Sequence, residues 1–131
     1  MKSPVPNLGL LVLRMALGGS MLLAHGWGKL VGFSAHAAQF PDPLGVGSKF
    51  SLGLTVFAEF FCSAFVVLGI LTRWSLLPLI VTMAVACFVI HASDPFSSKE
   101  LSFLYLCGFV GLWLSGPGRW SVDHMILGRK S

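Results

Sequence analysis

The sequence predicts an all-α integral membrane protein, folded as a four-helix transmembrane bundle in one domain covering residues 1–131. Composition is the first reason: 55% of the 131 residues are apolar and 11% are charged, and the mean hydropathy is +0.82. A soluble domain of this size keeps too much of its surface exposed to hide so many apolar side chains. The same composition excludes a disordered chain.

The distribution of charges is the second reason. Residues 74–93 and 101–118 contain no Asp, Glu, Lys or Arg, and each run approaches the roughly 20 residues that cross the hydrocarbon core of a bilayer. Two more apolar spans carry one charge each, Arg14 in the first and Glu59 in the second. The first span predicts a retained helix and not a signal peptide, because Arg14 interrupts it and no small-residue cleavage site follows cleanly. We therefore expect membrane-spanning helices over residues 7–28, 50–72, 74–93 and 100–115.

Basic residues predict the orientation of the bundle. Four spans put both termini and the turn near Arg73 on one side of the membrane, and that side holds five basic residues: Lys2, Arg73, Arg119, Arg129 and Lys130. The opposite side holds three, offset by three acidic residues: Lys29, Lys49 and Lys99, with Asp42, Asp94 and Glu100. The positive-inside rule then places the N and C termini in the cytoplasm. The net charge of +4 is an orientation signal, and we expect no nucleic-acid partner because the chain has no basic stripe with interleaved aromatic residues.

A polar stripe runs along each predicted helix, and together the stripes predict a site inside the bundle. In the first helix Arg14, His25 and Lys29 fall within about 60° of one another at ~100° per residue. Because ionisable groups in membranes avoid lipid, the stripes should converge on a cavity that opens outward. Its mouth is predicted to contain His25, Lys29, His91 and Lys99. Its floor is predicted to contain the candidate catalytic pair Glu59 and Arg14, with Arg14 reaching toward Glu59.

Several of these residues also have purely structural interpretations. Arg14 and Glu59 can be a buried ion pair that fixes the register of two helices. His25 and His91 are typical of the membrane interface, and we favour that role over ligation of haem because neither histidine has a diagnostic context. Lys29 and Lys99 can be snorkelling residues at helix ends.

The cysteines and the loop at 34–40 are not assigned to a site. Cys62, Cys87 and Cys107 lie singly in three helices, so we interpret them as small core residues and expect neither thiol exchange nor a metal site. Residues 34–40 can form either a lid over the cavity or a surface connector, and the sequence does not decide between them.

Short motifs in this order resemble the DoxX family of small bacterial membrane proteins. Residues 25–29 read His-Gly-Trp-Gly-Lys after Arg14, and residues 68–73 read Leu-Gly-Ile-Leu-Thr-Arg. Residues 115–123 follow the family's closing T-G-P-G-x-x-S-x-D pattern, with Ser115 in place of Thr; Lys99 is followed by Glu100 where the family usually has an uncharged residue. The resemblance covers nearly the whole chain and implies a four-helix protein of the bacterial inner membrane.

The closing motif is expected to be structural. Gly116, Pro117 and Gly118 should end the fourth helix sharply. Ser121 or Asp123 should cap a short amphipathic helix over residues 120–128, and Arg73 should pair with Asp123.

The resemblance implies a redox-associated subunit, since some family members look like the membrane subunit of a thiosulfate:quinone oxidoreductase or of a quinol oxidase. A quinone headgroup needs donors to its carbonyl oxygens and an ionisable group that moves protons, and the predicted mouth and floor offer both. The chain lacks a flavin motif, an iron–sulfur cysteine set and a convincing haem site, so we do not expect a complete enzyme; electrons would come from a partner redox protein. The alternatives are a non-catalytic membrane anchor for an extracytoplasmic or redox-stress protein, and a small-molecule or ion pathway built from several copies.

Overall fold

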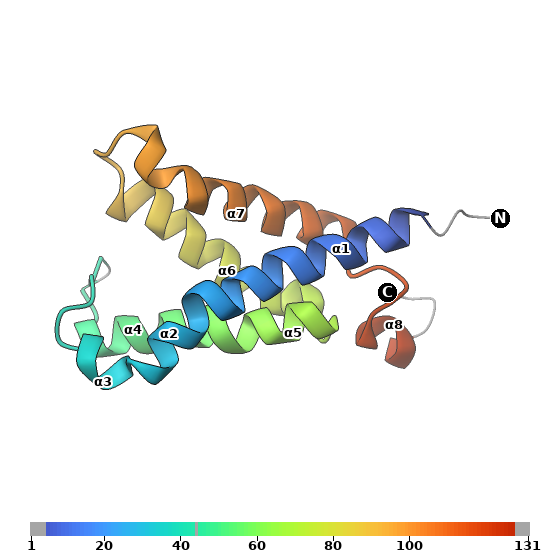
Figure 1. Ribbon diagram of the computed structural model, residues 1–131, viewed down its shortest axis with the longest axis horizontal. Helices are drawn as coiled ribbons and strands as arrows, with labels where there is room; N and C mark the ends of the chain where they lie inside the picture. Colours follow the sequence, from blue (N-terminus) through green and yellow to red (C-terminus); the bar gives the residue numbers. More distant parts are fainter. Residues whose placement is uncertain (1–4, 44, 128–131) are drawn as a thin grey trace.

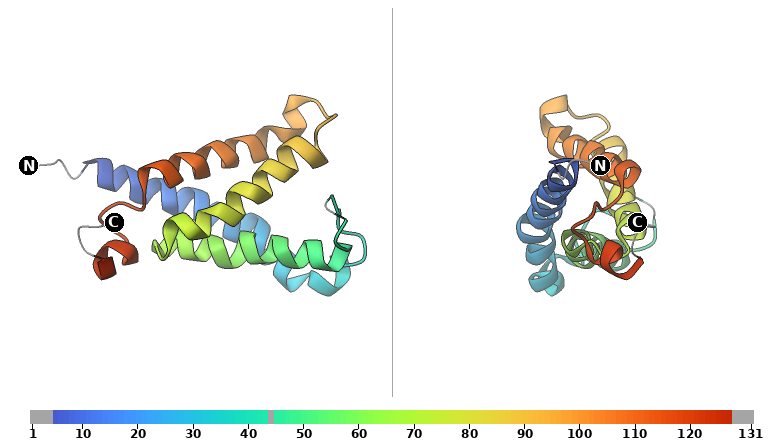
Figure 2. Two further views of the ribbon diagram at one scale, coloured as in Figure 1. Left: turned by 180° about the vertical axis from the view of Figure 1, so that it is seen from behind. Right: turned by 90° about the vertical axis from the view of Figure 1, so that its right-hand side faces the viewer.

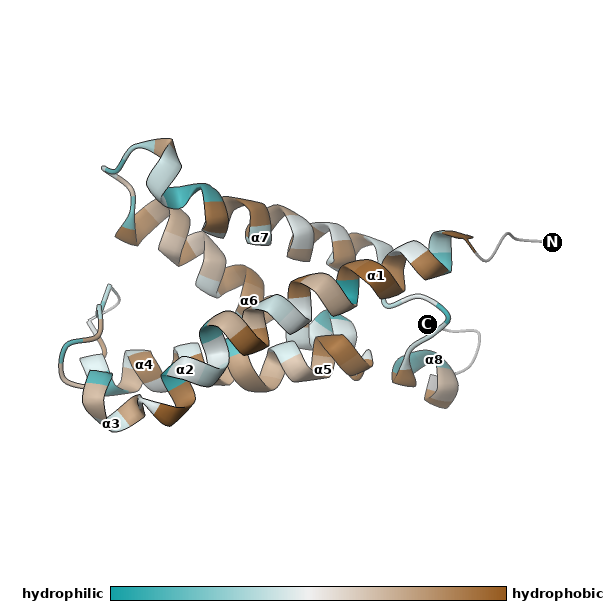
Figure 3. Ribbon diagram, in the orientation of Figure 1, coloured by the Kyte–Doolittle hydropathy of each residue, from teal (hydrophilic) through white to brown (hydrophobic). Residues whose placement is uncertain are grey.

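The computed structural model describes residues 5–43 and 45–127, and this part of the chain is helical with no strand. Three helices are long and apolar enough to cross a membrane: Val5–Val31, Ser48–Leu68 and Thr72–Ile90. The first comprises α1 (Val5–Ser20), η1 (Met21–Gly26) and α2 (Trp27–Val31). The second comprises α4 (Ser48–Val56), η2 (Phe57–Cys62) and α5 (Ser63–Leu68), and the third α6 (Thr72–Val85) and η3 (Ala86–Ile90). Large apolar side chains are exposed along all three helices, and Figure 3 marks the hydrophobic residues of each in brown.

A fourth long helix, α7 (Phe96–Ser115), lies along α6 and also contacts α1 (Figure 1). Its first turns contain the charged residues Lys99 and Glu100. Phe109 and Leu112 of α7 are fully buried in the core beside Met21, Leu76 and Leu79. The helix is therefore an integral part of the packed bundle.

The connections divide the molecule into two ends. The start of α1, the turn between α5 and α6, and the short helix α8 (Val122–Leu127) lie at one end (Figure 1). The connection through α3 (Phe33–His36) and the turn before α7 lie at the other end, and the end-on view in Figure 2 shows the long helices packed around one axis.

Helix boundaries differ from the predicted ones where the backbone turns. The second long helix ends at Leu68 and not at 72, because Gly69 adopts a left-handed conformation with φ of 73° that a side chain would strain. The third helix begins at Thr72 for the same reason, directly after Leu71 with φ of 45°. The fourth begins earlier than expected, at Phe96 immediately after Pro95.

The closing motif ties the C-terminal segment to this turn. Helix α7 ends at Ser115, and Gly116 leaves it with φ of 86°. The Ser121 hydroxyl accepts a hydrogen bond from the amide of His124, so Ser121 caps α8. Asp123 accepts hydrogen bonds from the amides of Leu71 and Thr72 at 2.7 and 2.8 Å, and so caps α6.

Arg73 does not pair with Asp123, and that expectation is wrong. Its guanidinium instead donates to the carbonyl oxygens of Trp113 and Leu114 at the end of α7. Carbonyls in the last turn of a helix lack partners within the helix, which explains why a guanidinium at this position turns toward them.

Cys107 is exposed on the outer face of α7, so its assignment to the core is wrong, whereas Cys62 and Cys87 are buried. Residues 34–40, for which the sequence allowed either a lid or a surface connector, lie in α3 and in the turn that follows it.

Candidate functional site

Glu59 is the centre of the candidate site. Its side chain is buried, with the residue only 4% exposed, in η2 at the middle of the second long helix. The Lys29 ammonium donates to its Oε1 oxygen at 2.5 Å. A buried carboxylate among apolar helices is costly unless an opposite charge neutralises it, and Lys29 provides that charge here.

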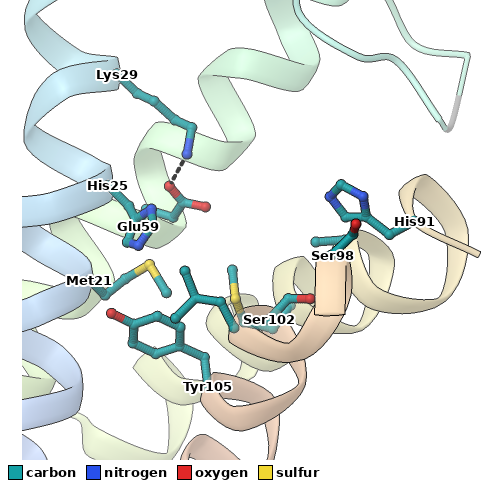
Figure 4. Close-up of a pocket in the computed structure, with 11 residues that line it drawn as sticks. Met21, His25, Lys29, Glu59, His91, Ser98, Ser102 and Tyr105 are labelled. Carbon is teal, nitrogen blue, oxygen red and sulfur yellow. Dashed lines mark hydrogen bonds and ion pairs between the residues drawn. The ribbon is translucent and has the colours of Figure 1, made fainter. Parts of the chain in front are cut away.

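A cavity of about 240 Å³ lies beside this ion pair. Figure 4 shows His25 next to Glu59, with Tyr105 and Met21 below them and His91 across the open space. Ser98 and Ser102 of α7 also line it, so side chains from all four long helices meet here. The walls combine ring edges, thioethers and hydroxyls with one carboxylate and one ammonium.

Three π-helical segments, η1, η2 and η3, supply residues to this cavity. Met21 and His25 come from η1, Glu59 from η2 and Ala86 from η3. A π-helical turn inserts an extra residue into a helix and rotates the side chains that follow, and such turns are frequent at functional sites. All three segments thus contribute residues to the lining of one cavity.

Close backbone contact fixes the position of Glu59. A β carbon on Gly26 would overlap the carbonyl group of Glu59, so only glycine lets η1 and η2 approach this closely. One turn of helix after Gly26, the side chain of Lys29 reaches the carboxylate.

The two histidines have different surroundings. The His25 ring stands perpendicular to Tyr105, with centroids 5.7 Å apart. His91 Nδ1 lies 2.8 Å from Asp94 Oδ2, near the outer end of the cavity. Among residues 5–43 and 45–127, no group of three His, Cys, Asp or Glu side chains is placed to hold a metal ion.

Arg14 does not belong to this site, and the expected contact between Arg14 and Glu59 is wrong. Arg14 is 1% exposed and its guanidinium donates to the carbonyls of Val66, Val67 and Trp120. Those carbonyls lie at the end of α5 and in the segment before α8, so Arg14 fastens the opposite end of the bundle. A helical wheel gave the face of Arg14 correctly but could not choose between partners at different depths.

Lys99 does not line the cavity either. Its ammonium donates to the Ala92 carbonyl at 3.3 Å, across the turn before α7. The neighbouring Ser98 takes the place expected for Lys99. The structure thus brings together His25, Lys29, Glu59 and His91 from the predicted set, and separates Arg14 and Lys99 from them.

Tyr105 is the main site residue that the sequence interpretation missed. It is the single tyrosine of the chain, it is buried, and it lies in an otherwise apolar run three residues after Ser102. The sequence did contain one signal for it, which is that this single tyrosine lies about one helical turn after a serine. Met21 and Met83 were missed because methionine in an apolar helix carries no such signal.

Comparisons with known proteins agree with this architecture. The family model described as DoxX matches residues 9–92, which is more than half of the chain. The chain belongs to the DoxX family. The match contains the Lys29–Glu59 pair and His91, and it stops before α7.

Two relatives extend the similarity beyond the matched region. The inner membrane protein YqjF of Escherichia coli strain K12 is 28% identical over 124 residues, covering 92% of this chain and 93% of YqjF. The uncharacterized membrane protein Rv3486 of Mycobacterium tuberculosis is 31% identical over 111 residues, covering 67% of this chain and 68% of Rv3486. No solved structure matches. Family membership and the three apolar helices make the chain a multi-pass protein of the bacterial inner membrane.

Proposed function

We propose that this DoxX protein is the membrane subunit of a quinone-linked oxidoreductase assembly, and that a quinone or quinol headgroup binds beside Glu59. The observation that carries the proposal is the cavity of about 240 Å³ in which a buried carboxylate, an ammonium, an imidazole and a phenol face one space. Quinones dissolve in the bilayer, so a protein that binds them needs a site among its membrane-spanning helices.

Each polar group has a role in this proposal. Lys29, His25 and Tyr105 donate hydrogen bonds to the two oxygens of the headgroup. Oxidation of a quinol releases two electrons and two protons; Glu59 accepts one proton and the neutral imidazole of His25 accepts the other, while Lys29 stabilises the Glu59 carboxylate before transfer. The electrons pass to a partner redox protein, in an assembly of the thiosulfate:quinone oxidoreductase or quinol oxidase type. Reduction of a quinone runs the same steps in reverse.

The proposal includes a topology with four spans and both termini in the cytoplasm. Helix α7 has 20 residues, which at ~1.5 Å per residue matches a hydrocarbon core of about 30 Å. Basic residues Arg73 and Arg119 lie at the end of the molecule that holds α8. In a cysteine-free background, Lys49→Cys should react with a membrane-impermeant maleimide on the outer face of spheroplasts. Arg119→Cys should react only after lysis, and the reverse result would invert the topology.

A second function is favoured by the same ion pair. The pair lies where the backbones of Gly26 and Glu59 touch, so it also fastens two helices together. A membrane anchor for an extracytoplasmic or redox-stress protein would need only this packing. In that case Glu59→Gln should lower stability and recovery of the complex without any selective effect on quinone binding.

Native mass spectrometry of the protein released from mild detergent separates the two functions. A quinone mass on the wild-type protein, lost in Glu59→Gln and kept in Glu100→Gln, supports the quinone site. Glu100 is the matched control because it is exposed and lines neither the cavity nor the ion pair. The quinone site is refuted if Glu59→Gln keeps the quinone, or if the wild-type protein binds none after reconstitution with an excess of quinone.

A further inference from the structure

A second cavity lies next to the first, on the other side of shared residues that include the ion pair. It has a volume of about 390 Å³ and lies between α4 and α6. The two cavities share four lining residues: Lys29, Glu59, Ala86 and His91.

The walls of this second cavity are apolar even where the sequence is polar. Thr55 donates its hydroxyl hydrogen to the Ser51 carbonyl at 2.9 Å, and Thr82 donates to the Pro78 carbonyl at 2.7 Å. Each threonine therefore has its hydroxyl satisfied within its own helix and can present its methyl group. Apart from the shared residues, the rest of the lining is Leu54, Val81, Val85, Ile90, Phe40, Pro41 and Pro43, with Ser51.

Ser51 is likewise satisfied, because its hydroxyl donates to Asp42 Oδ1 at 2.8 Å. Asp42 also accepts from the amides of Val46 and Gly47, and these bonds hold the segment around Pro41 beside the start of α4. Figure 2 shows the connection before α4 rising toward the end of the third long helix. Phe40, Pro41 and Pro43 in this segment line the cavity, and we call residues 40–43 its cover.

Two residues that line this cavity also reach the lateral surface of the protein. Leu54 of α4 and Val81 of α6 line it and are 45% and 58% exposed. Both belong to helices that are long and apolar enough to span the membrane, so their exposed faces meet lipid tails. A hydrocarbon chain that entered between these two residues would remain in apolar surroundings from the bilayer to the cavity.

We propose that the second cavity holds the hydrocarbon tail of the ligand, which enters laterally between α4 and α6 and places its polar headgroup beside Glu59. The ligand class is thus a membrane-dissolved amphiphile with one prenyl or alkyl tail. This inference rests on the proposed function, since it assigns the tail of the quinone whose headgroup occupies the first cavity. It adds the route, the tail site and the residues that select for a tail.

The test compares two quinones with the same headgroup, one with a decyl tail and one with no tail, bound to the full chain in lipid nanodiscs. Val85→Trp fills the second cavity. Val89→Trp is its matched control, because Val89 is 53% exposed on the same helix and lines neither cavity. Each variant is compared with the wild type for one quinone at a time, so the different partitioning of the two quinones into lipid cancels.

Val85→Trp should raise the dissociation constant of the tailed quinone about tenfold or more, since overfilling an occupied space is costly. The tailless quinone should change by less than about twofold, and Val89→Trp should change neither. Equal weakening of both quinones, or of neither, overturns the tail site while leaving the headgroup site intact. Failure of the wild-type protein to bind either quinone overturns both proposals.

A photoreactive group at the end of the tail gives a second measurement that does not require a variant to fold. Crosslinks mapped by mass spectrometry should fall on residues 40–43, 51–55 and 81–85. Crosslinks confined to the apolar surface groove around Phe61, Phe65 and Trp74 would show that the tail lies elsewhere and would refute the proposal.

Discussion

Gly26 and Glu59 touch through their backbones. A β carbon on Gly26 would overlap the Glu59 carbonyl and lie 2.8 Å from the amide nitrogen of Phe60. Backbone atoms in two packed helices cannot yield as the end of a flexible side chain can. This contact therefore determines how closely η1 and η2 approach each other. It also determines the position along the helix axis at which the Glu59 carboxylate meets Lys29.

Gly26→Ala should force these helices apart. Overpacking costs roughly 1–3 kcal/mol, and the better helix propensity of alanine offsets only about 0.5–1 kcal/mol of that. We expect lower stability in unfolding by denaturing detergent, together with weaker quinone binding. Gly28→Ala is the control, because a β carbon there has nothing within 4 Å, and its stability should be unchanged or higher. Equal behaviour of the two variants would show that the contact at Gly26 is not limiting.

Removing one partner of the ion pair should cost more than removing both. Lys29→Met leaves the buried Glu59 carboxylate without its cation, whereas Lys29→Met combined with Glu59→Gln leaves two neutral groups. Breaking fully buried pairs costs roughly 3–5 kcal/mol; Lys29, whose side chain is 29% exposed, should lose less. The free energies of unfolding of the two single variants and the double variant measure this coupling. If the changes in the free energy of unfolding of the two single variants summed to that of the double variant, the two side chains would not interact in the membrane.

The sequence was sufficient for the parts of the fold that depend on composition and helical phase. Uncharged runs of about 20 residues located the third and fourth long helices, because runs of that length are typical of long apolar helices. Helical periodicity placed His25 and Lys29 on one face and toward the bundle axis, where the structure finds them beside Glu59.

Depth and local helix geometry could not be predicted in the same way. Arg14 and Lys29 share a helix face, so phase alone could not tell which of them reaches Glu59; the contact at Gly26 decides it. The π-helical segments η1, η2 and η3 shift the side chains that follow them out of regular α-helical register. Such segments depend on how the helices pack together, and the sequence of one helix alone does not predict them. Lys99 turned to a local carbonyl because the turn before α7 offered one within reach.

Arg14 should be essential for attachment of the C-terminal segment. Its guanidinium bridges Val66 and Val67 of the second long helix and Trp120, which lies 106 residues further along the chain than Arg14. Hydrogen bonds that involve a charged group contribute roughly 1.5–3 kcal/mol each. Arg14→Leu should therefore lower stability and release the segment around Arg119, and Arg14→Lys should rescue it only in part because an ammonium cannot form the planar fork.

Limited digestion with trypsin measures this release, since Arg119 is an exposed cleavage site. Cleavage after Arg119 should be faster in Arg14→Leu than in the wild type. Lys49→Leu removes a positive charge from an exposed position at the other end of the bundle and should leave the cleavage rate unchanged. Unaltered cleavage in Arg14→Leu would show that other contacts hold the segment.

Asp42 should make the cover of the second cavity sensitive to acid. The pKa of its carboxyl lies below the ordinary value of 3.8, chiefly because the Ser51 hydroxyl donates to it, with further bonds from the amides of Gly47 and Val46. A carboxyl whose pKa is lowered by folding stabilises the folded state above its ordinary pKa, and that contribution is lost as pH falls through the lowered value. Protonation thus releases the segment around Pro41 from α4.

Amide hydrogen exchange at Val46 and Gly47 reports this release. Protection should be constant at pH values well above 3.8 and should fall as the medium becomes more acidic than that. Asp42→Asn should show weak protection at every pH, and Ser51→Ala should move the loss of protection to higher pH because it removes the strongest bond to the carboxylate. If protection in the wild type did not change across this range, or if Ser51→Ala behaved as the wild type, the Asp42 bonds would not be what holds the cover in place.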